Sequence, residues 1–347
     1  MMQIFNFLKE VCEIGSVCGD EYKLCNKICS KLKIFNFEMI IQKSGNLIIH
    51  IKGKKSSRKI MLFTHVDEPG LVINRIDKKG FLKFDRVGDI SIADLASQEV
   101  IVNGNNEVLG LVGLRPPHIL TEEERKAAIT MNELRIDIGY DKNKAECMVP
   151  VGSTAFVKRN VYRLNENAVS GRALCDKAGA AILCSIIKNQ KNFNDDLYVV
   201  FGVQHYNNFY GAVDAANMIK PDIAIVVDYA EAKSREKSHI FQECGLGPVI
   251  YKGPTAHTKL TENLIEYADQ NNIKYQINAG SGKNGTDAWA IQVCCGGIPT
   301  IIIQNPVKYC HSFVEVLNEN DIIEAVNLLD GYIDYIGSID WSDLLCY

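Results

Sequence analysis

The sequence predicts an α/β fold with a doubly wound, mostly parallel sheet and a second, β-rich domain inserted into it. Buried apolar runs alternate with amphipathic helical segments near both ends of the chain, which is typical of βαβ units. Between about Gly70 and Leu164, short apolar runs alternate with turn sequences at intervals of about ten residues. The length of 347 residues is enough for about two domains.

The amino-terminal segment predicts two helices and then two strands, with the second strand ending at His65. Apolar residues at helical spacing predict the helices, and continuous apolar runs predict the strands. In chain order these elements are a helix from Ile4 to about Gly15, a helix at 21–32, and strands at 46–51 and 59–64.

The middle segment predicts a small β-barrel or sandwich, because its short strands are separated by Asn-, Asp- and Gly-rich turns. The expected strands are 71–76, 80–84, 99–102, 108–112, 134–138 and 154–157.

After Gly171 the pattern becomes βαβ again. We expect helices at 178–188, 258–270 and 321–336, and buried parallel strands at 197–203, 223–227 and 300–303. The α/β domain is therefore predicted to be discontinuous, formed by 1–68 and 165–347, with the β-rich domain at 69–164.

Composition excludes several classes of protein. Lys and Arg total 38 against 42 Asp and Glu, so the chain lacks the basic surplus of a nucleic-acid-binding protein. The 12 cysteines include no CxxC pair, which argues against a zinc ribbon or a thioredoxin-like site. Charges at Lys9, Glu10 and Glu13 do not fit a signal peptide, and no apolar run reaches the length of a membrane span. We expect a cytoplasmic protein with reduced thiols.

Three polar residues lie at or after the ends of predicted parallel strands: His65, Asp228 and His311. Functional residues of open α/β sheets gather at the carboxyl ends of the strands, so these side chains are expected to converge. Imidazole and carboxylate both suit Zn²⁺. Asp67 lies two residues after His65 and could orient its imidazole.

Several motifs, in the right order along the whole chain, resemble one family. Thr64-His-Val-Asp-Glu-Pro-Gly70 resembles an HxDE-x-G motif, and Asn132-Glu-Leu-Arg-Ile-Asp-Ile-Gly139 resembles an EL-x-ID-x-G strand. Further matches lie at 113–118 (PPH), 121–125 (EER), 282–288 (TDA), 297–300 (GIPT) and 306–312 (P-x-RY-x-HS). The sequence is identified as similar to the dinuclear metallo-aminopeptidases that form tetrahedral particles, the glutamyl aminopeptidase and endoglucanase-M-like family.

The resemblance implies a doubly wound peptidase domain of the phosphorylase/hydrolase type, interrupted by a small PDZ-like β-barrel that serves in dimerisation. It also implies an aminopeptidase that acts on peptides or peptide-like molecules. A homo-oligomer built from dimers, and as large as a dodecamer, is implied as well. Neither a nucleic acid nor a membrane is expected as a partner.

The family holds two metals with a His, a bridging Asp, a Glu, an Asp and a second His, and a further Glu is the general base. By resemblance, His65, Asp228 and His311 occupy three of the ligand positions. In Ala173-Leu-Cys-Asp-Lys-Ala-Gly179, the spacing to Gly179 aligns Cys175 with the bridging Asp. In Gln204-His-Tyr-Asn-Asn-Phe-Tyr-Gly-Ala212, the general base aligns with His205 and the Glu ligand with Tyr206.

These replacements change the chemistry. A thiolate can bridge two zinc ions, but its bonds are longer, about 2.3 Å, and it is oxidisable. A phenol with a pKa near about 10 is mostly neutral at neutral pH and is a poor ligand. A general base typically contributes about 10²–10⁴ in rate, and His205 differs from Glu in both charge and reach.

Three interpretations follow. The chain is a degenerate member that keeps the fold as a scaffold, peptide binder or regulatory subunit, with no metal. Alternatively it is a modified hydrolase with one Zn (or Co or Mn) on His65, Asp228 and Cys175, and His205 as base. The third is a fully active aminopeptidase with two metals.

His257 and the pair Thr286 and Asp287 are given further roles. His257 lies where the family often has a His near the active-site entrance, so it is a candidate for contact with substrate or with a neighbouring subunit. Thr286 and Asp287 are expected to order the loop beneath the site through side-chain to backbone hydrogen bonds.

Overall fold

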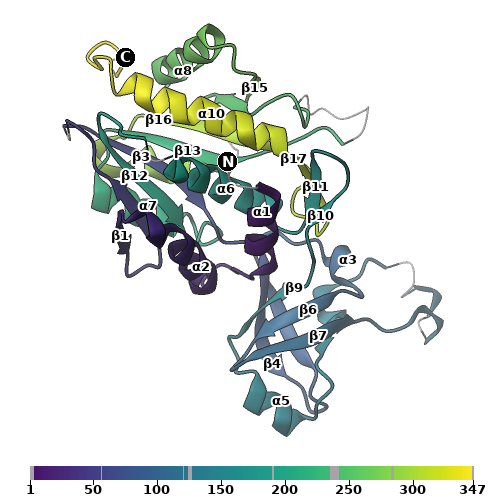
Figure 1. Cartoon of the computed structure of the whole chain (residues 1–347). Coiled ribbons are helices and arrows are strands. Elements are labelled where there is room, and N and C mark those ends of the chain that lie inside the picture. Colours follow the sequence, from purple (N-terminus) through teal and green to yellow (C-terminus); the bar gives the residue numbers. More distant parts are fainter. Residues whose placement is uncertain are drawn as a thin grey trace.

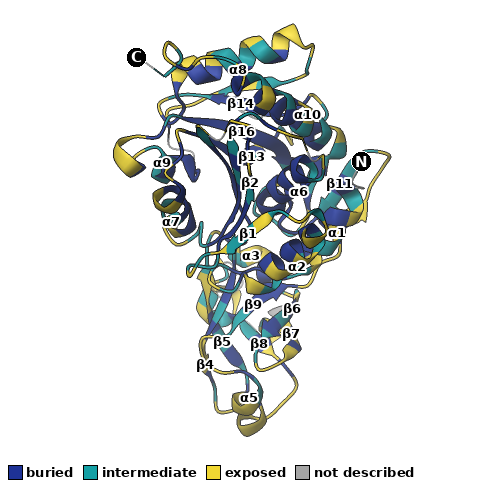
Figure 2. Ribbon diagram, turned by 60° about the vertical axis from the view of Figure 1, so that its left-hand side comes forward, coloured by how far each residue is buried: buried dark blue, intermediate teal, exposed yellow. Residues whose placement is uncertain are grey.

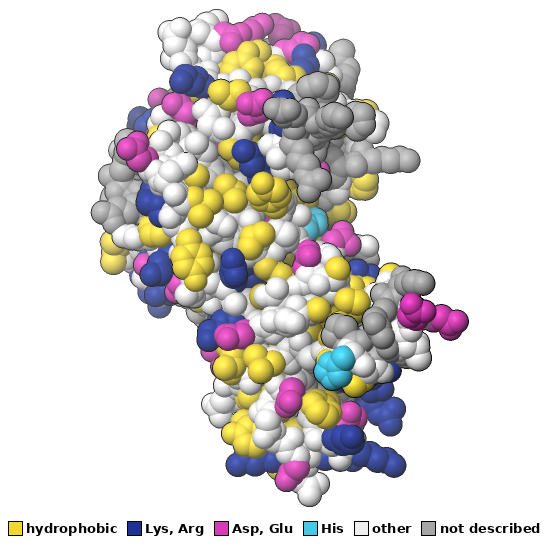
Figure 3. Space-filling view, turned by 90° about the vertical axis from the view of Figure 1, so that its right-hand side faces the viewer, with side chains coloured by type: hydrophobic (Ala, Val, Ile, Leu, Met, Phe, Trp, Pro, Cys, Tyr) yellow, Lys and Arg dark blue, Asp and Glu magenta, His cyan; other side chains and the backbone are white. Residues whose placement is uncertain are grey.

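The computed structural model describes residues 4–55, 57–119, 121–123, 127–189, 191–234, 242–282 and 285–345. Two of the segments that carry the family resemblance, 121–125 and 282–288, lie partly outside these residues. The chain forms a larger α/β lobe and a smaller lobe made by a closed barrel (Figure 1). A view from the side shows the barrel lobe projecting below the larger one (Figure 3).

The centre of the large sheet consists of four parallel strands in the order β12, β3, β13, β16. These strands are nearly continuous apolar runs, as expected for strands buried on both faces. Their bounds are Asp196–Gly202 (β12), Lys59–His65 (β3), Ile223–Glu231 (β13) and Thr300–Lys308 (β16).

Shorter strands extend this sheet on both sides, mostly antiparallel to their neighbours. On the β12 side lie β2 (Leu47–Ile51) and β1 (Glu38–Ile41). On the β16 side lie β17 (Glu315–Asn318), β11 (Ala168–Gly171) and β10 (Tyr162–Arg163). β14 (Val249–Lys252) pairs with both β16 and β15 (Gln276–Ala279).

Helices cover both faces of this sheet (Figure 2). One face packs against α1 (Ile4–Glu13), α2 (Tyr22–Leu32), α6 (Leu174–Lys188), α8 (Thr258–Gln270) and α10 (Glu319–Ile336). The other face packs against α7 (Tyr210–Ile219) and α9 (Ala288–Ile291). The predicted doubly wound α/β architecture is confirmed.

The smaller lobe is a closed six-stranded antiparallel barrel, and all six strands predicted for the insertion are present. Alternation is clear in β7, where Val108 and Val112 point into the barrel while Leu109 and Leu111 are exposed. In barrel order the strands are β4 (Gly70–Ile76), β5 (Leu82–Val87), β8 (Arg135–Asp137), β7 (Glu107–Gly113), β6 (Glu99–Asn103) and β9 (Thr154–Val157). The lobe also carries α3 (Ile92–Leu95) and α5 (Lys142–Met148).

Two predicted boundaries are wrong in ways that affect the site. α6 begins at Leu174 and not at Ala178, so Cys175 lies in its first turn. Its N–H donates to the Glu315 carboxylate of β17, a contact 140 residues away that local sequence does not show. β13 continues to Glu231, because Asp228 and the residues after it pair with β16, so Asp228 lies within the strand and not after it.

The register brings the carboxyl ends of the central strands together. His65 is paired with Gly202 at the end of β12, and Asp228 is paired with Gln304 of β16. The barrel follows β3 directly, so the predicted site residues lie at the junction of the two lobes. Among the described residues, no helix is both long and apolar enough to cross a membrane.

Candidate metal and active site

Two histidines stack at the end of β3. His65 is the last residue of that strand, and His205 lies in the loop that follows β12. Left-handed backbone at Gln204 (φ 57°) and Phe209 (φ 58°) bends this loop sharply. The two imidazole rings lie 4.0 Å apart between centroids, with 18° between their planes.

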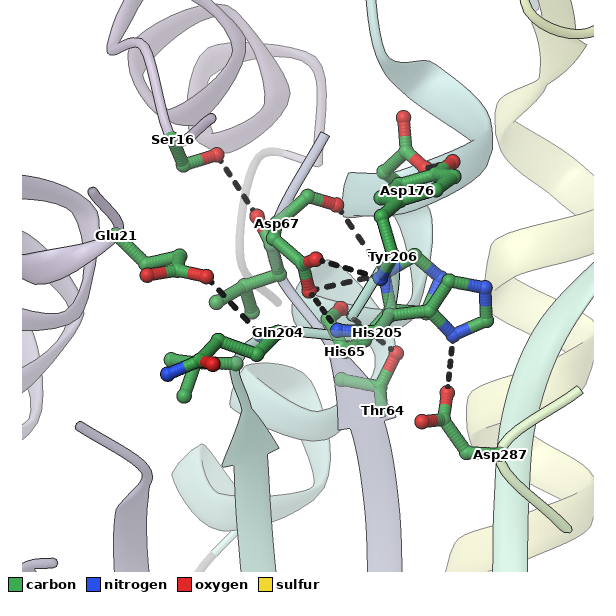
Figure 4. Close-up of polar contacts among 12 residues, drawn as sticks. Ser16, Glu21, Thr64, His65, Asp67, Asp176, Gln204, His205, Tyr206 and Asp287 are labelled. Carbon is green, nitrogen blue, oxygen red and sulfur yellow. Dashed lines mark hydrogen bonds and ion pairs between the residues drawn. The ribbon is translucent and has the colours of Figure 1, made fainter. Parts of the chain in front are cut away.

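Asp67 fixes both histidines (Figure 4). Its carboxylate accepts the backbone N–H of His205 at 3.0 Å and that of Tyr206 at 3.2 Å. His65 Nδ1 lies 3.2 Å from the Asp67 carbonyl oxygen and 3.7 Å from Oδ1. Asp67 is therefore placed to orient His65 and to hold the loop that carries His205.

Asp287, in the loop before α9, contacts one of the stacked histidines. Its Oδ2 lies 2.8 Å from His205 Nδ1 (Figure 4). Among the residues that the structure describes, its Oδ1 has no hydrogen-bond partner although it is buried, and the residue is 1% exposed. The expectation that Asp287 orders its own loop is wrong, because its carboxylate faces His205. Thr286 does receive a local backbone N–H, from Ala288 at 3.5 Å.

Carboxylates surround both imidazoles and oppose the effect of burial on their charge. Burial lowers the pKa of His65, but the hydrogen bond to Asp67 and the charge of Asp287 raise it to about 10. For His205, burial and the charge of His65 lower the pKa, and Asp287 and Asp228 raise it above the ordinary value. The stack therefore lies in a region of negative potential that favours cations.

A second acidic group braces the same loop from the amino-terminal segment. Glu21 Oε1 accepts the N–H of Gln204 at 2.9 Å and that of Gly19 at 2.8 Å. Burial, with the charge of Asp67, raises the pKa of Glu21 to about 7. Cys18 lies beside Glu21 and Asp67, and burial raises the pKa of its thiol. Since the carboxylate oxygens already accept backbone N–H groups, this group is a loop support.

A buried ion cluster fixes the start of the barrel. Glu68, the residue after Asp67, forms ion pairs with Arg172 and with Lys177, whose Nζ lies 3.3 Å from Oε1. The Ser16 N–H also donates to Glu68, at 2.8 Å. These contacts tie the amino-terminal segment, the end of β3 and helix α6 to one another.

His311 is hydrogen-bonded to neighbouring residues of the site. Its Nε2 is 2.7 Å from the Tyr229 hydroxyl, and its backbone N–H donates to Glu315 at 2.8 Å. The Cys175 thiol also donates to Glu315, with Sγ 2.9 Å from Oε1. His311 has left-handed backbone (φ 62°), which this network holds.

Tyr206 and Asp176 are hydrogen-bonded to each other. The Tyr206 hydroxyl donates to Asp176 at 2.8 Å. Burial, with the charge of Asp176, raises the pKa of Tyr206 well above its ordinary value. Asp176 was not predicted as a site residue, although it follows Cys175 directly; only the fold brings it to Tyr206.

Burial favours the protonated forms of the acidic groups around Glu315. Burial, with the charge of Asp176, raises the pKa of Glu315 to about 7. Burial, with Asp176 and Glu315, raises the pKa of Cys175 well above its usual value. The Cys175 thiol is therefore a hydrogen-bond donor here and not a thiolate. We call His65, His205, Asp67 and Asp287 the His65 group, and His311, Tyr229, Glu315, Cys175, Asp176 and Tyr206 the His311 group.

The ligand set that the resemblance implies does not fit two metals. The Cys175 thiol is bonded to Glu315 and the Tyr206 phenol to Asp176, so neither offers a free anionic ligand atom. In the described part of the chain, two groups of three have potential ligand atoms within 4.8 Å of one another. They are His65, His205, Asp287 and Cys18, Glu21, Asp67, and neither includes Cys175, Asp228 or His311.

Within this chain His257 lies apart from the other predicted site residues, and its contact with substrate or with a neighbouring subunit stays a prediction. Its backbone N–H donates to Thr300, the first residue of β16, whereas the site lies beyond the other end of that strand. Its Nδ1 accepts the Leu260 N–H at 3.3 Å and so caps α8. His257 is buried in this capping role, at the opposite edge of the sheet.

The α/β fold with a closed barrel inserted after β3 is that of a class of metal-dependent peptidases. The chain belongs to the M42 glutamyl aminopeptidase family, whose model matches residues 45–328.

Similar proteins span nearly the whole chain. A curated protein of Acetivibrio thermocellus, named "Putative aminopeptidase", is 36% identical over 94% of this chain and 97% of its own length. The lysyl aminopeptidase of Pyrococcus furiosus is 28% identical over 97% of this chain and 99% of its own. A solved structure of Pyrococcus horikoshii TET1 peptidase superposes with a TM-score of 0.86 at 30% identity, covering 95% of this chain and 99% of that one.

Proposed function

We propose that this chain is a degenerate aminopeptidase that keeps the family fold and binds peptides or peptide-like molecules without the ordinary dinuclear chemistry. The proposal depends on one observation above all. The side chains at the positions of the bridging Asp and the Glu ligand, Cys175 and Tyr206, are hydrogen-bonded to other acidic residues of the site. A second metal would have to break both bonds.

The ligand atom of His311 supports the same conclusion. His311 Nε2, which would have to bind the second metal, is bonded to Tyr229.

The alternative is an active metal-dependent aminopeptidase with a modified or mononuclear site. The set of His65, Asp228 and Cys175 is not favoured, because the Cys175 thiol is bonded to Glu315. His205 as general base has some support, since its ring lies against His65.

Metal content and turnover on the same sample test the proposal. The protein is purified without chelator, its metal content is measured by elemental analysis, and a panel of amino-acid nitroanilides is assayed with added Zn²⁺, Co²⁺ or Mn²⁺. We expect fewer than two metals per chain and no turnover above the metal-only blank. Two metals per chain with turnover would overturn the proposal.

We also propose that the chain forms a homo-oligomer in the cytoplasm, with the barrel (69–164) as its dimerisation domain. Pyrococcus horikoshii TET1 assembles into a tetrahedron or an octahedral shell. On the barrel of this chain, Leu109 and Leu111 are 50% and 54% exposed side by side on β7. Light scattering on the purified protein measures the mass of the assembly, and a monomer would contradict the proposal.

A further inference from the structure

We propose that His65, His205 and Asp287 form a mononuclear site for a divalent cation of the Zn²⁺ class. This set shares only His65 with the ligand positions that the resemblance implies. The inference is compatible with the proposed degenerate function but does not require it, because a single metal at this place does not restore the dinuclear site.

Geometry is the first argument. The three potential ligand atoms lie within 4.8 Å of one another. Zinc bonds of about 2.0–2.2 Å place neighbouring ligand atoms of a tetrahedron about 3.3–3.6 Å apart. The ligand atoms are therefore close enough to bind one metal once the stacked rings tilt out of their 18° arrangement.

The unpartnered oxygen of Asp287 is the second argument. Asp287 Oδ1 is buried and finds no hydrogen-bond partner in the described part of the chain, although Oδ2 is bonded to His205. Leaving a buried acceptor unsatisfied is unfavourable, so such an oxygen calls for a binding partner. Because Oδ1 belongs to a carboxylate held against His205, a cation is the complementary partner.

The surroundings of His65 are the third argument. Metal-bound histidines commonly use one ring nitrogen for the metal and the other for a carbonyl or carboxylate. His65 Nδ1 lies 3.2 Å from the Asp67 carbonyl oxygen and 3.7 Å from its carboxylate, so Nε2 points away from Asp67. The His205 side chain is 10% exposed and that of Asp287 2%, so the site is shielded from bulk solvent.

Chemistry selects the metal class. Two imidazoles and one carboxylate are a set that Zn²⁺ uses in mononuclear sites, and no thiolate is involved. Three protein ligands leave a fourth position for water or a ligand group.

Zinc titration of the apo-protein by calorimetry tests the inference, with Co²⁺ as a spectroscopic probe. We expect one Zn²⁺ per chain and Co²⁺ d–d absorption without a thiolate charge-transfer band. Asp287→Asn and His205→Gln should each weaken Zn²⁺ binding at least about 100-fold, since even residues that only support a ligand contribute about 10–100-fold.

His311→Gln and Cys175→Ser are the matched controls, because each changes the His311 group alone. Both should keep the wild-type Zn²⁺ affinity within a few-fold. Circular dichroism checks the fold of every variant, and His205→Gln stands in if Asp287→Asn does not fold. Zinc binding that survives Asp287→Asn and His205→Gln, or that is lost in His311→Gln, would overturn the inference.

The outcomes also separate this inference from the proposed function. A protein that binds no Zn²⁺ and shows no turnover would contradict the inference and would still be consistent with the proposed degenerate function. If the protein binds two metals per chain and its turnover is abolished by His311→Gln, the proposed degenerate function is contradicted. One Zn²⁺, lost in Asp287→Asn and without peptidase turnover, would support both.

Discussion

The His65 group and the His311 group lie at the same edge of one sheet, yet they differ in how their polar atoms are satisfied. In the His311 group, the Tyr206 and Tyr229 phenols and the Cys175 thiol are hydrogen-bonded to neighbouring side chains. In the His65 group, two stacked imidazoles lie beside the Asp287 carboxylate, one of whose buried oxygens has no partner among the residues described by the structure.

This difference is what the proposed degenerate function would produce if the ligands of one metal were replaced. Replacing a ligand in a buried site leaves its former neighbours unsatisfied, which costs about 1–3 kcal/mol for each group. Tyr206 and Cys175 avoid that cost because they donate to Asp176 and Glu315. His205 makes a similar bond to Asp287, but the second Asp287 oxygen has no partner among the described residues, so of the two groups the His65 group keeps an unsatisfied acceptor there.

The largest expected effect comes from restoring the carboxylates with the triple variant Cys175→Asp, His205→Glu and Tyr206→Glu. Without metal, the new charges lie beside Glu315, Asp176 and Asp287, so we expect a lower free energy of unfolding than in the wild type. With Zn²⁺ at 100 times its Kd, binding should add about 2.7 kcal/mol. Urea unfolding with and without Zn²⁺, and metal analysis, measure both effects.

Adding His311→Gln to the triple variant is the control for this prediction. Binding at the dinuclear ligand positions should then weaken, because His311 would be a ligand. A folded triple variant that binds no metal would mean that the loss of the site extends beyond these three side chains.

A smaller effect is expected from removing single hydroxyl groups of the His311 group. Tyr206→Phe removes the donor to the buried Asp176 carboxylate, and hydrogen bonds to charged groups contribute about 1.5–3 kcal/mol. Tyr229→Phe removes a bond to an imidazole nitrogen and should cost about 0.5–1.5 kcal/mol. Urea unfolding at one pH compares the two. Equal losses would contradict the view that the Tyr206 hydroxyl satisfies a charged Asp176 carboxylate.

Much of this architecture could be predicted from sequence. The pattern of apolar residues predicted the central strands and the barrel strands, because each strand buries several residues in a regular pattern. The start of α6 was missed because Glu315 caps it from another element. His65, His205 and Tyr206 were predicted from local motifs, whereas Asp176 and Asp287 contact their partners across 30 and 82 residues.

The smallest expected effect concerns the support of the loop that carries His205. The pKa of Glu21 is raised to about 7 in the folded state by burial and by Asp67, so the folded protein holds this proton at a pH where the unfolded chain has lost it. The resulting stabilisation is complete below about pH 4.5 and is lost as the pH rises to about 7. Glu21 also lines a cavity of about 180 Å³ open to water, so we expect only about 1–2 kcal/mol.

Glu21→Gln tests this contribution without removing the hydrogen bonds, since both backbone N–H groups donate to Oε1, which Gln retains. Urea unfolding of wild type and variant is measured from pH 4.5 to 8. The free energy of unfolding of the wild type should fall relative to that of the variant as the pH rises. The exposed Glu122 provides the control, since Glu122→Gln should change stability by less than about 0.5 kcal/mol throughout. A Glu21→Gln difference that does not vary with pH would mean that Glu21 supports the His205 loop through hydrogen bonds alone, and that its proton has no part in holding the His65 group in place.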